Sequence, residues 1–530
     1  MCHVNNKQGV WSMYNKIIKE IKSENFKFIA IITIIFMLAA HGFVYLNTIF
    51  SHDSMKIIYW GESLSYDTLE IGRFTIPVLL LIRGKYYPPF LIGMLSIIFM
   101  ILLIYFLVKL FNIKDKKYMA ILSSILSTSC TITLLNATYI EYSDMYIFSF
   151  LLATLSSYLL LKSKSKFKVP LSIILFVIAM GIYQTTLPIF VVLIIISTIL
   201  EVLKKNNIKN TFIKFFKNMS IGAIASGLYL VTYKVTLKIL NIAPSDKYNS
   251  VNSLAKYNTL NDIFNAIKNQ YNATINFIIH PSTYYKKIVI ILNISLIVLA
   301  LLLVLLTSIK RKKTIVQNIF LVILILGLTF SINCTFFFSN GTLHQLMIFP
   351  MFILYMFLIV LIEKLLEYKV LKSSYLRVAH KFMLVSFAFI TLSSIIYSNQ
   401  VYLKKQMEFE STKLTMNRII ERMESVEKYN VQTTPVVFIG YLKDGPLAYK
   451  KPDLDYDSVG LWSPYSITYY LNYKQFLNNY MGYPVNVLDK EASLQIAQKE
   501  EVQKMEAFPS KKSIKMVDDV LVIKMGPYSY

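Results

Sequence analysis

The chain has 530 residues, of which 55% are hydrophobic and 16% are charged, and its mean hydropathy is +0.51. This composition is too apolar for a soluble protein and excludes that class. The net charge of +25 lies mostly in short loops between apolar segments, where anionic lipid headgroups attract it. We therefore expect a lipid bilayer around the protein and no nucleic-acid partner.

Eleven apolar segments have or approach the length of about 20 residues that a helix needs to cross the hydrocarbon. The segment 169–183 is the weakest of them because it is short. No small-residue cleavage site follows the first segment, so we interpret it as a span and not as a cleaved signal peptide. The predicted spans are 27–50, 88–111, 118–138, 143–161, 169–183, 186–203, 217–240, 287–309, 315–336, 342–363 and 382–398.

Loops rich in lysine and arginine alternate regularly with loops that contain neither, and this alternation predicts which loops lie in the cytoplasm. Residues 1–26 are therefore expected in the cytoplasm and residues 399–530 outside, in a multi-pass protein of a bacterial cytoplasmic membrane. The abundance of Ile, Lys and Asn is typical of an AT-rich bacterial genome. Basic residues cluster around 109–117, 162–168, 204–217, 310–313 and 364–381, whereas 139–142, 184–185 and 337–341 contain none.

Two outer loops interrupt the predicted membrane domain, 27–398. In the first, 51–87, the stretch 68–83 is apolar but too short to span, so we expect it to lie along the outer surface or to re-enter it. The second, 241–286, is polar and rich in Tyr and Asn, with a helix-like pattern around Leu260–Tyr271.

The tail, 399–530, predicts a small folded domain. A charged, helix-like pattern covers 400–429, and the apolar run Pro435–Gly440 is typical of a buried strand. Val485–Leu488 and Val520–Lys524 are further strand candidates. The predicted fold class is an all-α polytopic membrane bundle followed by an extracytoplasmic α/β domain.

Cysteine and histidine give no sign of a disulfide framework or a metal site. The three cysteines are Cys2, Cys130 and Cys334, and the last two lie inside predicted spans. The six histidines are scattered along the chain. We therefore expect neither a metal nor a cofactor.

The first outer loop concentrates acids and bases against the membrane surface. Asp53 follows the first span directly and is presented at the mouth of the bundle. Such a carboxylate can act as general base toward a hydroxyl, and arginine binds phosphate through two parallel hydrogen bonds. Alternatively, Asp53 is an ordinary solvated acid of the loop, and the basic side chains only extend to the membrane interface. The ionisable residues of the loop are His52, Asp53, Asp67, Glu70, Arg73, Arg83 and Lys85.

Two carboxylates open the predicted fourth span. Glu141 and Asp144 are three residues apart, and this spacing places them on one face of a helix. Asp144 or Ser143 can also be the cap of that helix, which is the simpler explanation.

Two further polar positions lie near the outer ends of spans. Tyr183 and Gln184 form a polar break between two apolar segments; a tyrosine there is usually an interfacial anchor, whereas the glutamine can bind a sugar. Lys234 lies inside the seventh span. A cation in a span indicates a functional site, here for phosphate, although Lys234 is near enough to the end to reach the interface.

Four short motifs, in this order and spacing, resemble the glucosyltransferase II-like family of membrane glycosyltransferases associated with O-antigen glucosylation. The resemblance covers nearly the whole chain, although 241–340 is unspecific, and Phe74 stands where the family commonly has Trp. The motifs are His52-Asp53-Ser54, Gly72-Arg73-Phe74 with Arg83-Gly84 and Pro88-Pro89 after it, Asp144-Met-Tyr146, and Gly181-Ile-Tyr183-Gln184.

The resemblance implies a GT-C-like enzyme that uses a polyprenyl-phosphate sugar and carries its catalytic Asp in the first outer loop. By position, Asp53 is the expected base and Arg73 the leading phosphate ligand; Arg83 and Lys234 are expected phosphate ligands from their own chemistry. The residues expected to contact substrate are His52, Asp67, Glu70, Asp144, Tyr183 and Gln184.

The expected reaction moves a hexose, most simply glucose, to a cell-surface polysaccharide or a teichoic-acid-like polymer, with inversion and without metal. A synthase that makes the donor and a flippase that delivers it are the expected partners. Two alternatives remain. A polymerase or ligase of the O-antigen type would use a diphosphate-linked oligosaccharide, and a flippase for lipid-linked sugars would need paired ionisable residues near the bilayer midplane.

Overall fold

The computed structural model describes residues 18–49, 68–84, 86, 88–204, 207–245, 259–279, 287–337, 345–369, 371–440 and 470–527. Within these ranges nine helices are long and apolar enough to cross a membrane, and two shorter apolar helices accompany them. Each predicted span coincides with one of these eleven. They are α2 (Glu24–Leu46), α6 (Pro89–Phe111), α7 (Lys116–Ser127) with α8 (Cys130–Thr138), α9 (Ile140–Lys162), α10 (Lys168–Ile182), α11 (Thr186–Lys204), α12 (Ile208–Leu240), α14 (Lys287–Lys310), α15 (Ile315–Ser331), α16 (Phe349–Tyr368) and α17 (Ser373–Glu424).

The helices divide into an inner and an outer set. Most residues of α7, α8, α9, α11 and α16 are buried, whereas only about a quarter of those of α12 and α14 are. The exposed residues of the outer helices are largely apolar, for example Ile35, Val231 and Leu305. Apolar surface of this extent is typical of a face that lipid covers. The predicted polytopic helical bundle is confirmed.

The third predicted span, 118–138, is confirmed as a candidate span and consists of two helices, α7 and α8, which are separated at Thr128 and Ser129. Hydroxyl side chains compete with backbone N–H groups for helix carbonyls, and the Thr128 hydroxyl donates to Ser124 O at 2.9 Å. The break leaves Ser127 O available to the buried His41, whose Nε2 lies 2.9 Å away. A polar contact thus joins α2 to the inner helices.

Basic loops meet at one end of the bundle. Lys114, before α7, pairs with Glu367 at the end of α16, with 2.9 Å between Nζ and Oε1. Arg311, after α14, donates to Lys204 O at the end of α11 at 2.8 Å. The sequence alternation of lysine-rich and lysine-free loops therefore corresponds to two opposite ends of one bundle.

Short elements cover the other end. The stretch 68–83 forms a turn and then α5 (Ile76–Arg83), which is too short to span, as predicted. In the second loop, α13 (Leu260–Ile279) runs beyond its predicted end. Gln270 fastens α13 to the end of α15, because its Nε2 donates to Phe330 O at 2.8 Å.

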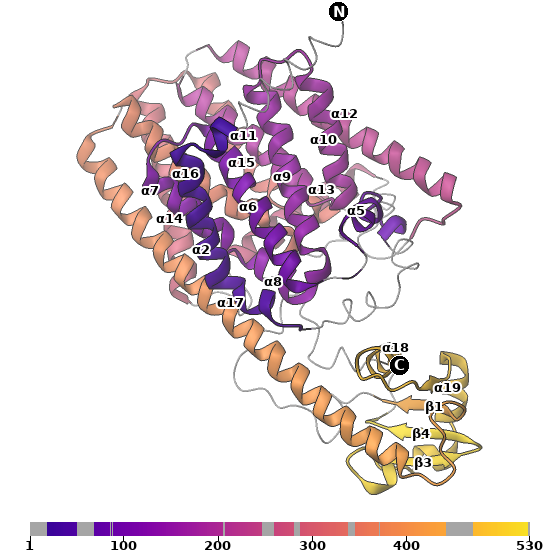
Figure 1. Ribbon diagram of the computed structural model, residues 1–530. Coiled ribbons are helices and arrows are strands. Elements are labelled where there is room, and N and C mark those ends of the chain that lie inside the picture. The colour runs from indigo at the N-terminus through magenta and orange to yellow at the C-terminus, as the bar shows by residue number, and fades with distance from the viewer. Residues whose placement is uncertain are drawn as a thin grey trace, which may run out of the picture.

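The C-terminal domain is attached through α17, which passes along the bundle and continues to the sheet (Figure 1). This helix has 52 residues and is about 78 Å long, more than twice the thickness of the hydrocarbon layer, which is about 30 Å. At its far end the Arg422 guanidinium donates to Pro509 O at 2.7 Å and to Ser510 O at 3.0 Å. One helix therefore holds both parts of the chain.

The domain contains a four-stranded sheet of order β2-β1-β4-β3, in which β1 is parallel to both neighbours and β3 is antiparallel to β4. Three of its strands confirm the prediction, and β3 was missed. The signal for it is the pair Asp518-Asp519, whose positive φ angles of 46° and 60° suit a two-residue hairpin turn. The strands are β1 (Pro435–Ile439), β2 (Asn486–Val487), β3 (Ile514–Val517) and β4 (Val520–Lys524), and the short helices are α18 (Tyr470–Gln475), α19 (Lys490–Ala497) and α20 (Glu500–Gln503).

Candidate active site

The turn before α5 is inserted into the lysine-free end of the bundle. It closes on itself through Arg73 N, which donates to Thr68 O at 2.8 Å. It is fixed to the last turn of α10, because Thr75 N donates to Gly181 O at 2.9 Å. A Cβ at Gly181 would lie 2.5 Å from the Thr75 hydroxyl, so only glycine allows this close approach.

Gly72 lets the same turn lie against α12. Its φ is +87°, a left-handed conformation, and a Cβ there would collide with the Tyr229 hydroxyl. Gln184 Nε2 donates to Ile71 O at 2.6 Å and to the Tyr229 hydroxyl at 3.0 Å. The Tyr229 hydroxyl donates in turn to Gly72 O at 3.1 Å. Two buried side chains, one from the turn between α10 and α11 and one from α12, thereby fix the backbone on either side of the glycine.

Arg73 is held among tyrosines. Its Nη1 donates to the Tyr146 hydroxyl at 2.6 Å, and its Cζ lies 5.5 Å from the centre of that ring and 5.2 Å from the centre of the Tyr183 ring. The two rings stack on each other at 4.2 Å. These distances are within the range of cation–π contacts.

Arg73 also keeps capacity for another ligand. Its Nε is buried and has no hydrogen-bond partner within the described ranges. Burial acts to lower the pKa of Arg73, but the surrounding tyrosines outweigh it and the pKa lies above its ordinary value. The side chain is therefore a permanent cation.

Arg83, at the end of α5, forms a buried ion pair with Asp144 of α9. Nη1 and Oδ1 are 2.6 Å apart, and the two side chains are only 5% and 3% exposed. The predicted capping role of Asp144 or Ser143 is wrong, because α9 begins at Ile140 and Asp144 lies inside its first turns. The predicted shared face holds, since Glu141, three residues before Asp144, is fully buried as well.

Asp144 leaves other N–H groups of Arg83 available to a ligand. Nε and Nη2 are buried and have no hydrogen-bond partner in the described part of the chain. These two nitrogens form one edge of the guanidinium plane, the edge that binds two oxygens of a phosphate or carboxylate side by side. Asp144 occupies the other side of the group, so Arg83 is oriented and still able to bind an anion.

A line of polar side chains links α9 to α8 and α2. The Ser143 hydroxyl donates to Asn136 Oδ1 of α8 at 2.7 Å, and Asn136 Nδ2 donates to the Tyr45 hydroxyl of α2 at 3.1 Å. Within a membrane domain, buried polar groups of this kind need partners. The line therefore fixes the position of the Asp144 turn relative to α2 and α8.

The structure brings six of the ten predicted residues to this end of the bundle and leaves one apart. Lys234 is on the exposed side of α12, directly after Tyr233, whose hydroxyl donates to Glu70 O at 2.6 Å. Three predicted residues, His52, Asp53 and Asp67, lie outside the described residues. The six are Glu70, which makes its contact with Tyr233 through its backbone carbonyl, and Arg73, Arg83, Asp144, Tyr183 and Gln184.

Sequence reasoning singled out Tyr183 but not the other tyrosines of the site. Tyr229 and Tyr233 are four residues apart on α12, and both are buried at the face toward the turn. Tyr146 was named only as part of a motif. A tyrosine pair at helical spacing inside a span was the signal, since a phenol in hydrocarbon needs a partner.

The site combines two fixed guanidinium groups with aromatic faces, an arrangement suited to a phosphate ester of a sugar. Arg73 and Arg83 contact the same turn of α9, through Tyr146 and Asp144. In the described ranges no three His, Cys, Asp or Glu side chains form a group that could hold a metal ion.

A family model matches the greater part of the chain. The model described as Glucosyl transferase GtrII matches residues 42–362, which include the turn, α5 and the helices from α8 to α12. No curated protein and no solved structure matches the chain significantly. The match covers more than half of the chain and stops before the C-terminal domain. The chain belongs to the GtrII family of glucosyl transferases and is a membrane glycosyltransferase.

Proposed function

We propose that the protein transfers glucose from a polyprenyl-phosphate donor to a cell-surface polysaccharide or a teichoic-acid-like polymer, on the outer face of the membrane. The observation that carries the proposal is the free edge of Arg83. Nε and Nη2 are buried without a partner among the described residues, while Asp144 holds Nη1. A phosphate that carries a lipid chain can reach this edge from the bilayer, and it supplies the oxygens that the edge requires.

The donor phosphate lies between the two arginines. Arg83 binds two of its oxygens, and the buried Nε of Arg73, which has no partner among the described residues, donates a third hydrogen bond. The sugar then lies toward Tyr183 and Gln184, which flank the Arg73 side. Aromatic faces and an amide are groups that bind a hexose well.

The reaction is a single displacement. The Asp53 carboxylate takes the proton of an acceptor hydroxyl, and the acceptor oxygen attacks the anomeric carbon. The bond from that carbon to the phosphate oxygen breaks, and polyprenyl phosphate leaves with the bonding electrons. The arginines stabilise the charge that grows on the leaving phosphate, so the step needs no metal, and attack from the opposite side inverts the configuration.

The proposed location of the site on the outer face rests on the difference in lysine content between the two ends of the bundle. Lysine-rich loops meet at one end, and the arginines lie at the other, which is also the end from which α17 continues to the sheet. The lysine-rich end is cytoplasmic by the positive-inside rule. A synthase and a flippase then supply the donor to the outer leaflet.

The test is transfer of radiolabelled glucose from undecaprenyl-phosphate-glucose to envelope polymer, in membranes with wild type or Asp53→Asn at matched levels. We expect transfer by wild type that EDTA does not change and that the variant loses. Equal transfer by both proteins would exclude Asp53 as base, and retention of configuration would exclude the single displacement. Transfer only from a diphosphate-linked oligosaccharide would favour the polymerase or ligase class.

A further inference from the structure

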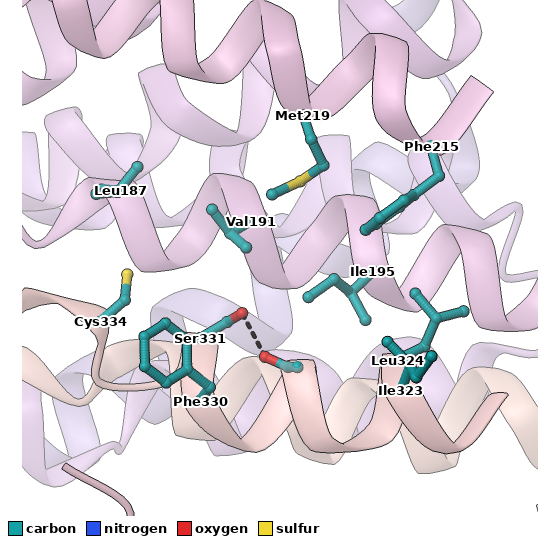
Figure 2. A pocket seen from close by; sticks show the side chains of 11 residues that line it. Leu187, Val191, Ile195, Phe215, Met219, Ile323, Leu324, Phe330, Ser331 and Cys334 are labelled. Atoms are coloured by element: carbon teal, nitrogen blue, oxygen red, sulfur yellow. Dashed lines mark hydrogen bonds between the residues drawn. The ribbon is translucent and has the colours of Figure 1, made fainter. Parts of the chain in front are cut away.

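An apolar groove runs between α11, α12 and α15, inside the part of the bundle that lipid surrounds. Its volume is about 390 Å³ (Figure 2), which is within the range of ligand sites. On α11 the lining residues Leu187, Val191 and Ile195 follow each other at intervals of four, along one side of the helix. The groove therefore extends about 12 Å along that helix.

Among the described residues, the lining of the groove offers no polar anchor to a ligand. Ser331 is part of its wall, but its hydroxyl donates to Gly327 O at 2.5 Å, as the dashed line in Figure 2 shows. Ile323, on the same wall, is 56% exposed, so the groove is reached from the outside of the bundle. An occupant has to be apolar and has to enter from the bilayer.

One end of the groove adjoins the arginine site. Leu187 lies in the first turn of α11, where its N–H donates to Gln184 O at 3.1 Å. Gln184 and Tyr183 belong to the site, and the Tyr183 ring centre is 5.2 Å from the Arg73 Cζ. An apolar channel and a cationic site are thus separated by a single helical turn.

We propose that the groove holds the first isoprene units of the donor's polyprenyl chain while its phosphate lies at Arg73 and Arg83. This inference rests on the proposed function and adds a second binding site for the same molecule. An apolar chain gains little from leaving lipid, because lipid is as apolar as the groove. The groove therefore acts by shape, because it fixes the direction of the chain.

Filling the groove tests this inference through the length of the donor chain. A Cβ at Gly327 meets only Ile195 Cδ1, at 3.8 Å, so Gly327→Phe can place its ring in the groove. The matched control is Gly227→Phe on α12, where a Cβ meets nothing within 4 Å. The two donors are undecaprenyl-phosphate-glucose and an analogue with one isoprene unit, which is too short to enter far.

We expect Gly327→Phe to raise KM for the long donor about three- to tenfold, because only van der Waals packing in the groove is lost. KM for the short donor should be unchanged. Gly227→Phe should change neither value. An equal loss with both donors would indicate damage to the site itself, and no loss with the long donor would show that the groove is empty during catalysis. Either result overturns the inference.

A second measurement separates this inference from the proposed reaction, because it needs no transfer. Undecaprenyl phosphate with a photoreactive group in its first isoprene units should label peptides that contain 187–195 or 323–334 of the wild type, and Gly327→Phe should reduce this labelling. A phospholipid with a photoreactive acyl chain is the competing occupant. Labelling by the phospholipid that excess undecaprenyl phosphate does not displace would assign the groove to bulk lipid and overturn the proposal. Labelling by the polyprenyl probe without transfer would instead leave the groove assigned and refute the reaction.

Discussion

Asp144 holds Arg83 by a single nitrogen: Oδ1 accepts from Nη1 at 2.6 Å, while Nε and Nη2 stay buried without a partner among the described residues. The pair joins the end of α5 to α9 and orients the free edge of the guanidinium. Breaking a buried pair by removing one partner generally costs about 3–5 kcal/mol. The pair therefore has a structural and a functional role, which mutations can separate.

The first prediction concerns that pair. Asp144→Asn keeps the shape of the side chain but removes the charge that orients Arg83, so we expect KM for the donor to rise about tenfold or more, equivalent to at least about 1.4 kcal/mol. The measurement is the initial rate of glucose transfer against donor concentration. In the double variant with Arg83→Met the loss should be no greater than with Arg83→Met alone. Additive losses would mean that the two residues act independently.

The second prediction concerns the turn at Gly72. Gly72→Ala has to displace the Tyr229 hydroxyl and the Gln184 amide, so we expect it to abolish most of the transfer activity. Gly84→Ala is the matched control, because Gly84 also has a positive φ, +93°, but a Cβ there meets nothing within 4 Å.

Removing the hydroxyl that causes the collision should restore part of this activity. We expect Gly72→Ala with Tyr229→Phe to be more active than Gly72→Ala alone, measured as transfer per amount of folded protein. Equal losses in Gly72→Ala and Gly84→Ala would attribute the effect to backbone strain alone and contradict the packing argument.

The third prediction separates charge from shape at Arg73. Arg73→Lys keeps the cation but loses the planar group beside Tyr146 and Tyr183. Because a lost charge-assisted hydrogen bond is worth about 1.5–3 kcal/mol, kcat/KM for the donor should fall about ten- to a hundredfold. Arg377→Lys, on the exposed side of α17, is the control and should leave kcat/KM unchanged. Full activity of Arg73→Lys would reduce the role of this residue to its charge.

The fourth prediction concerns orientation. In a background without native cysteines, Glu491→Cys in the C-terminal domain should react with a membrane-impermeant maleimide on intact cells. Lys164→Cys, in a lysine-rich loop, should react only after the cells are opened. Both side chains are exposed, so a difference in labelling reports sidedness. The reverse pattern would place the arginine site on the cytoplasmic side.

The arrangement of spans could be predicted from the sequence because hydropathy is a local property. The positions of the eleven helices, the short α5 and three of the four strands all followed from windows of a few residues. The interruption between α7 and α8 did not, because it depends on hydroxyl groups that compete for carbonyls and on His41 from another helix.

Residues of the candidate site could be named from the sequence, but their contacts with one another could not. Arg73 and Arg83 were found from their chemistry and position, but the contact of Gly72 with Tyr229 spans 157 residues of chain. Asp144 looked like a helix cap because local rules do not contain Arg83. Lys234 lies on the exposed side of α12, and the side of a helix that faces a site depends on its neighbours.

The most direct test of donor and chemistry is to identify the carrier that the purified protein releases in lipid vesicles. Labelled polyprenyl-phosphate-glucose and an acceptor polymer are supplied, and glucose in the polymer is compared with free carrier. We predict polyprenyl monophosphate in equimolar amount to the transferred glucose, and the loss of both products in Arg83→Met. Release of polyprenyl diphosphate, or transfer from a nucleotide sugar alone, would contradict the proposed reaction.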